Sequence, residues 1–238
     1  MHIPDGYIGP LTYGILWIVM IPIWLYAGNW LKKNLKDRQV PYLALAAAFS
    51  FVIMMFNVPI PGGSTGHAVG SALIAIILGP WVAVVTVSVA LLLQALLFGD
   101  GGITALGANC FNMAFVMPFV AFYVYSFISG KTEITSKRRI LAAGVAGYLA
   151  LTAGAFATGV ELGLQPMLHA VDGAALFPYG LSITLPAMLI QSLLFFSFVE
   201  AIVTALAFAY LARSDPTIIF NYTRRREQMK DPIPTAPV

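Results

Sequence analysis

The stretch that decides the fold class of this chain is PWVAVVTVSVALLLQALLF, from Pro80 to Phe98. It holds no charged residue, and it is close to the roughly 20 apolar residues that a helix needs to cross a membrane. Similar stretches precede and follow it. They are Leu11–Leu31, Pro41–Val58, Ala105–Ser126, Ile140–Leu162 and Ser182–Ala212, with a shorter one at Gly66–Leu78. The sequence therefore predicts an all-α integral membrane protein.

The composition supports this prediction. Of 238 residues, 59% are hydrophobic and 10% are charged, whereas a soluble domain carries about 25% charged residues. So few charges cannot cover a surface in water, and most of the surface must face the lipid bilayer. The net charge of +3 does not indicate a nucleic-acid partner, because the basic residues are confined to a few connections.

The basic residues also predict the orientation in the membrane. All 13 Lys and Arg residues fall within 32–38, 131–139 and 213–230. An excess of Lys and Arg marks cytoplasmic connections, so we expect these three stretches on the inner side. The connections without a basic residue are those around Asp5, Asp100, Glu161 and Asp172.

The number of crossings follows from this asymmetry. If Gly66–Leu78 did not cross, the first two basic stretches would lie on opposite sides of the membrane. We therefore predict seven transmembrane helices, with the N-terminus outside and the C-terminus cytoplasmic. Residues 1–212 form a single seven-helix domain, and 213–238 form a basic cytoplasmic tail. No signal-peptide pattern opens the chain, and the bulky His2 should protect Met1 from removal.

The first two residues carry the most specific chemistry. The Met1 α-amine, the His2 amide nitrogen and His2 Nδ1 can chelate one ion through fused rings and fill three corners of a square. Planar nitrogen sites favour Ni²⁺ or Cu²⁺. The ligands must be deprotonated, so binding should weaken as the pH falls, and reference pKa values place this transition near neutrality. The alternative is an exposed histidine in a flexible tail.

The fourth corner needs another ligand, and His67 is the histidine in a suitable outer segment near a span. Its alternative is an ordinary hydrogen-bonded loop histidine. His169, the third histidine, lies in the connection from Gly163 to Leu181, where we expect it to be solvated.

Four acidic residues are further candidates. Asp100 and Asp5 could orient a ligating imidazole, although Asp100 in Gly-Asp-Gly-Gly could equally be a turn residue. Glu161 and Glu200 lie near or within predicted spans, where an ionisable group is costly and indicates a function. We expect Glu200 to face neighbouring helices near the cytoplasmic half.

The sequence lacks the residues that several other functions would require. The glycines of Gly62–Gly66 are not followed by the Lys-Ser/Thr of a phosphate-binding loop, and no His-Glu-x-x-His occurs. Every lysine lies in a basic connection, so none can form a retinal Schiff base. Cys110 is the single cysteine, which excludes an intramolecular disulfide.

Four blocks, in order, resemble the nickel and cobalt substrate-binding (S) components of energy-coupling factor transporters, the NikM and CbiM group. The resemblance is strongest over roughly residues 1–120, and the nickel subgroup is the nearer one. The blocks are Met-His-Ile-x-Asp-Gly at the start, GGSTGHAVG at 62–70, LGPW at 78–81 and QALLFGDGGITALGAN at 94–109.

The resemblance implies a seven-helix S component in a prokaryotic cell membrane that binds Ni²⁺, or else Co²⁺, as the transported substrate. Met1 and His2 match the chelating tail of the family, and His67 matches its loop histidine. It also implies a transmembrane coupling (T) subunit, cytoplasmic ATPase (A) subunits and often a small auxiliary membrane subunit. Ala44 and Ala48 form a small-xxx-small face that could dock a partner or pack within the molecule.

Three other functions remain open at this stage. An S component for an organic micronutrient would need a roomy pocket and would not depend on His2. A membrane-embedded enzyme could use Glu161, His169 and Asp172 as an outer-face site. A structural membrane subunit would tolerate substitutions in its outer loops.

Overall fold

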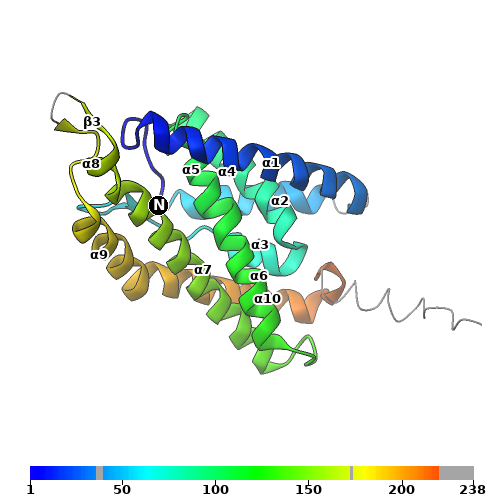
Figure 1. The fold of residues 1–238 in the computed structure, drawn as a ribbon. Helices are drawn as coiled ribbons and strands as arrows, with labels where there is room; N and C mark the ends of the chain where they lie inside the picture. The colour runs from blue at the N-terminus through cyan, green and yellow to red at the C-terminus, as the bar shows by residue number, and fades with distance from the viewer. Residues whose placement is uncertain (36–39, 172–173, 220–238) are drawn as a thin grey trace, which may run out of the picture.

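The computed structural model describes residues 1–35, 40–171 and 174–219, and its described part is almost entirely helical (Figure 1). Asp172 and most of the predicted tail therefore lie outside the described residues. The α-helices are α1 (Pro10–Asn34), α2 (Val40–Met54), α3 (Ser71–Leu78), α4 (Pro80–Phe98), α5 (Leu106–Cys110), α6 (Met117–Ser129), α7 (Lys137–Gly163), α8 (Gln165–Leu168), α9 (Leu181–Gln191) and α10 (Ser197–Ser214).

Short elements complete the chain. Two π-helical turns join α-helices into longer runs: η2 (Phe111–Val116) between α5 and α6, and η3 (Ser192–Phe196) between α9 and α10. A 3₁₀ turn, η4 (Pro216–Ile218), follows α10. Two antiparallel pairs of two-residue strands occur. They are β1 (Val58–Pro59) with β2 (Thr65–Gly66), and β3 (Ala170–Val171) with β4 (Ala174–Ala175).

Within the described residues, five helical runs are long and apolar enough to cross a membrane. This confirms an all-α membrane protein. The runs are Pro10–Asn34, Pro80–Phe98, Leu106–Ser129, Lys137–Leu168 and Leu181–Ser214. The predicted stretch Pro41–Val58 is helical only from Val40 to Met54, and the chain then enters the β1–β2 hairpin.

The short apolar segment is also helical. α3 has eight residues, and seven of them are buried. It packs against α4, α6, α7 and α10, so protein surrounds it on most sides. This position explains how so short a helix is tolerated, because irregular backbone at membrane depth needs protein or a polar cavity around it.

The long helix α7 organises the packing. It lies along α6, α9 and α10 (Figure 1), and small residues make close approach feasible. A Cβ built on Gly147 would lie 3.0 Å from Thr204 Oγ1 of α10, and one on Gly154 would lie 2.8 Å from Met117 Cγ of α6.

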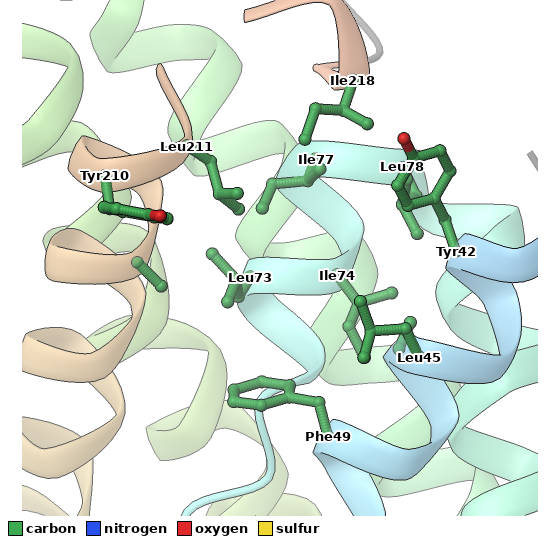
Figure 2. Close-up of a pocket in the computed structure, with 12 residues that line it drawn as sticks. Tyr42, Leu45, Phe49, Leu73, Ile74, Ile77, Leu78, Tyr210, Leu211 and Ile218 are labelled. Atoms are coloured by element: carbon green, nitrogen blue, oxygen red, sulfur yellow. The ribbon is translucent and has the colours of Figure 1, made fainter. Parts of the chain in front are cut away.

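An apolar groove of about 370 Å³ opens among α2, α3 and α10, with Ile218 of η4 at one end (Figure 2). Figure 2 shows Leu73 and Ile77 of α3 facing Leu211 of α10. On the other side of α3 lie Leu45 and Phe49 of α2. Among the described residues, those that line this groove are all uncharged, and they offer no metal-binding side chain.

Candidate metal centre

The chain begins inside the helix bundle (Figure 1). Met1 and Ile3 are fully buried and His2 is 1% exposed. Asn109 of α5 holds this tail at Ile3, because its Oδ1 accepts from Ile3 N at 2.8 Å and its Nδ2 donates to Ile3 O at 3.1 Å. Gly102 N also donates to Ile3 O, at 2.8 Å. Both backbone groups of Ile3 therefore have protein partners, although the segment is irregular.

Two nitrogens of the tail converge on one hydroxyl. Thr65 Oγ1 accepts from the Met1 amine at 2.8 Å and from His2 N at 3.2 Å. The amine also donates to the Thr65 carbonyl, and the Ser64 hydroxyl donates to the His2 carbonyl. The β1–β2 hairpin presents Ser64 and Thr65 to the tail. The amine and the amide nitrogen thus already point to a common position, as a chelate requires.

The His2 ring is oriented by Gln94 of α4. His2 Nε2 lies 3.1 Å from Gln94 Oε1, and Gln94 Nε2 donates to Phe51 O at 3.1 Å, which fixes which end of the amide faces the ring. Since the facing atom is an oxygen, His2 Nε2 carries the proton. The lone pair is therefore on His2 Nδ1, a buried atom that lacks a hydrogen-bond partner.

His67 presents a second such nitrogen. Its Nδ1 lies 3.1 Å from the carbonyl oxygen of Ala68 and so carries the proton, leaving the buried Nε2 as a bare lone pair with no hydrogen-bond partner. The rings of His2 and His67 are stacked, with centroids 4.5 Å apart and planes at 22°. Two buried imidazoles in contact, each with an unpaired nitrogen, form a set of donors that suits a transition-metal ion.

Glu200 of α10 holds the turn that follows His67. Its Oε2 accepts from Val69 N at 2.8 Å and from Gly70 N at 3.0 Å. Gly70 has a φ of 74°, which favours glycine, and the side chain of Phe49 occupies the space a Cβ would need. Glu200 thus faces the start of α3 and fixes the backbone next to a candidate ligand.

Asp100 is the acidic residue at the site. Its Oδ1 lies 3.3 Å from His2 Nδ1, and its Oδ2 accepts from Asn57 Nδ2 at 2.8 Å. It therefore faces the unpaired nitrogen of His2, whereas the opposite nitrogen is held by Gln94. The adjacent Gly101, with a φ of 85°, lets the loop approach the ring, because a Cβ there would lie 3.3 Å from His2 Cδ2.

Burial also sets the protonation of the tail. It lowers the pKa of the Met1 α-amine well below its usual value of 8.0, and it lowers the pKa of His2 to about 3. The cause is the cost of a charge away from water. For both groups burial therefore favours the neutral form, which can offer a lone pair to a metal. The pH at which metal binding weakens stays a prediction, because the His2 amide nitrogen must still lose its proton.

The remaining candidates lie elsewhere. Asp5 is exposed, and its carboxylate accepts from the backbone of Ile103 and Thr104, so it holds a loop and orients no imidazole. Glu161 Oε2 accepts from Asn112 Nδ2 at 2.7 Å. His169 is half-buried, because its ring covers Gly9 and its Nε2 is buried without a hydrogen-bond partner among the described residues, so it is less solvated than expected.

Four residues that hold the tail through their side chains were not predicted as site residues: Ser64, Thr65, Gln94 and Asn109. Their side chains are neutral and carry no ligand signature. One signal was present, because Gln94 is a polar amide inside the apolar stretch that decides the fold, where such a group needs a buried partner. Across the described ranges, no three His, Cys, Asp or Glu side chains gather closely enough to hold a metal. Backbone and terminal nitrogens are thus needed to complete a site.

Membrane-length helices and a buried set of nitrogen donors define a multi-pass membrane protein with a candidate transition-metal site. The chain matches the family described as "Cobalt uptake substrate-specific transmembrane region" over residues 2–218, and it belongs to that family. This confirms the predicted NikM and CbiM resemblance and the location in a prokaryotic cell membrane. The match also extends well beyond the first 120 residues.

Individual relatives agree. The chain is 49% identical to the fused nickel transport protein NikMN of Rhodobacter capsulatus over 221 residues, which is 92% of this chain but 64% of that longer protein. It is 42% identical to a putative metal transport protein of Methanocaldococcus jannaschii, over 96% of this chain and 98% of the relative. A crystal structure of a transition metal transporter has a TM-score of 0.86 and 44% identity, covering 97% of this chain and all of the other.

Proposed function

We propose that this chain is the substrate-binding membrane subunit of an ATP-driven nickel importer, with cobalt as the second ion it can carry. The observation that carries the proposal is the pair of buried, unpaired imidazole nitrogens, His2 Nδ1 and His67 Nε2, beside a buried α-amine. A buried polar atom without a partner is rare in native proteins and calls for an explanation. An ion supplied from outside explains all three groups together.

The ion would be held by four nitrogens: the Met1 amine, the His2 amide, His2 Nδ1 and His67 Nε2. In the structure the first two both donate to Thr65 Oγ1, and of these hydrogens a metal would replace only that of the His2 amide. A square of four nitrogens suits Ni²⁺, and Cu²⁺ would bind at least as tightly by affinity order alone. Selection of nickel in the cell would then rest on availability and geometry.

The names of the relatives support transport as the function. NikMN of Rhodobacter capsulatus is a nickel transport protein, and a relative from Roseiflexus, 38% identical over 56% of this chain, is a cobalt transport protein. The chain itself performs no covalent chemistry in this proposal. Energy would come from cytoplasmic ATPase subunits through a transmembrane coupling subunit, with a small auxiliary membrane subunit where one is present.

The proposed topology has seven crossings, with α2 and α3 as the two short ones, the metal site outside and residues 213–238 in the cytoplasm. Ala44 and Ala48 are exposed on α2, whereas Ala46 between them is buried and lines the groove of Figure 2. Exposed small residues at this spacing let another helix approach closely. We therefore propose Ala44 and Ala48 as a contact for the coupling subunit.

The test uses nickel binding to the purified chain in detergent, measured by calorimetry and by metal content. Two residues placed before Met1 move the histidine to the fourth position, where no terminal amine can share its chelate. Nickel affinity should fall by about 100-fold or more. The matched control adds the same two residues after Val238 and should bind like the natural chain.

Two histidine variants complete this test. His67→Ala should weaken nickel binding about as much as the extension, whereas His169→Ala should leave it nearly unchanged. Full nickel binding by the extended chain would disprove the tail as a ligand. A natural chain that binds no nickel would instead favour an S component for an organic micronutrient. The reverse ranking of the two histidines would move the site to the connection that holds His169.

A further inference from the structure

The candidate ligands are closed off from solvent. Met1 and His67 are fully buried and His2 is 1% exposed. An ion that arrives from water as a hydrated dication must lose that water before it can reach them. Moving a charge from water into a protein interior is costly unless another charge compensates for it. The route of the ion therefore needs a charged group that contacts both the solvent and the ligands.

Asp100 meets both conditions. Its side chain is 19% exposed, so water reaches it, and its Oδ1 lies 3.3 Å from His2 Nδ1, the nitrogen without a hydrogen-bond partner. Asn57 Nδ2 holds the other oxygen at 2.8 Å. The backbone N–H of Asp100 donates to Gln94 O at 3.2 Å, which fixes the residue to the end of α4. One carboxylate oxygen is thus anchored, and the other faces a ligand atom.

We propose that Asp100 is a relay ligand, which coordinates the incoming divalent cation first and passes it to His2 Nδ1. This inference rests on the proposed function. The hydrated ion binds Asp100 Oδ1 at the surface of the site. The negative charge of the Asp100 carboxylate compensates for the water that the ion loses. His2 Nδ1 then replaces the oxygen, and the carboxylate is released as the remaining nitrogens bind.

The donor set explains why the oxygen is left behind. A carboxylate is a harder ligand that suits Mg²⁺, Ca²⁺ or Mn²⁺, whereas imidazole and other nitrogen donors suit Ni²⁺. In the part of the chain that the structure describes, Asp100 and the two histidines do not form a three-residue metal site of their own. In this proposal the preference of Ni²⁺ for nitrogen donors makes Asp100 deliver the ion without retaining it.

The experiment measures association and dissociation rates of nickel by stopped-flow absorbance on the full chain in detergent. Asp100→Asn keeps the size of the side chain and removes its charge. The association rate should fall by about tenfold or more, as expected when a steering charge is lost. The dissociation rate should fall in parallel, so the dissociation constant changes by less than about threefold. The nickel absorption band should not change.

Two further variants make the test specific. Glu133→Gln removes one negative charge from an exposed residue in a basic connection and should leave both rates unchanged. Asp100→Glu keeps the carboxylate and should restore most of the association rate. Thermal unfolding of each variant shows whether the chain is folded.

Each contrary result has a distinct meaning. An unchanged association rate in Asp100→Asn would overturn the relay, as would an Asp100→Glu variant as slow as Asp100→Asn. A weaker equilibrium affinity with a shifted absorption band would make Asp100 a permanent ligand instead. A natural chain that binds no nickel would overturn the proposed function, and the relay with it.

Discussion

The nine residues before α1 and the helix α1 itself differ in a way that hydropathy does not foretell. The tail is irregular, yet its first three residues are at most 1% exposed. α1 is a regular apolar helix of 25 residues, yet only Met20, Ala27 and Leu31 of it are buried. A helix satisfies its own backbone and can face lipid, whereas an irregular segment cannot. The difference teaches that hydrogen bonding, more than hydrophobicity, decides which segment takes the interior.

The largest effect on nickel affinity should come from removing the side chain that hydrogen-bonds the backbone of the tail. Asn109→Ala leaves the N–H of Ile3 without its partner, whereas the carbonyl of Ile3 keeps the bond from Gly102 N. Each unsatisfied buried group costs about 1–3 kcal/mol, so we expect nickel affinity to fall by about 100-fold in calorimetry.

The control for this prediction is an asparagine at the end of α1. Asn34 is exposed and donates to Trp30 O of its own helix. Asn34→Ala should leave nickel affinity unchanged. If both variants bind nickel equally well, the tail does not depend on Asn109 and the contrast between the two regions fails.

A smaller effect should follow from releasing the His2 ring while leaving the tail backbone in place. Gln94→Met keeps the length of the side chain but removes the oxygen that accepts from His2 Nε2. Removing a partner that orients a ligating histidine lowers metal affinity by about 10- to 100-fold, and we expect the lower end here.

The conservative variant Gln94→Glu keeps an oxygen near the ring and should recover much of this loss, as measured by the same calorimetry. Equal weakness of Gln94→Met and Gln94→Glu would show that Gln94 acts through packing. It would then have no part in fixing the nitrogen that His2 presents.

The smallest effect should come from the exposed face of α1. Ile18 is 71% exposed, so Ile18→Ala should change the free energy of unfolding by less than about 0.5 kcal/mol. Met20 is fully buried two residues away, and Met20→Ala should cost about 2–5 kcal/mol. Thermal unfolding in detergent compares them. A variant at Ile18 as unstable as one at Met20 would show that this face of α1 packs against protein.

Much of the fold could be predicted from apolar length and charge. The predicted span Pro80–Phe98 matches α4 residue for residue, and Leu11–Leu31 lies within α1. The π-helical turns at Phe111–Val116 and Ser192–Phe196 could not be predicted, because an extra residue in a helical turn leaves no mark on hydropathy.

The sequence predicts the candidate ligands of the site but not the residues that position them. The chelate of Met1 and His2 follows from covalent chemistry, so it could be derived from two residues, and its vacant corner pointed to His67. The residues that position these groups could not be derived in this way. Thr65, Gln94 and Asn109 act through hydrogen bonds across 63, 92 and 106 positions of sequence, and only the packing of the helices brings them together.

The contact between Glu200 and the start of α3 has a consequence for how the protein is made. Glu200 is supplied by the last long helix, whereas the backbone groups it binds, Val69 and Gly70, belong to the first third of the chain. During synthesis those N–H groups have no access to this carboxylate until α10 has left the ribosome. The turn that carries His67 therefore reaches its final form late, and a half-made chain cannot yet present a complete metal site.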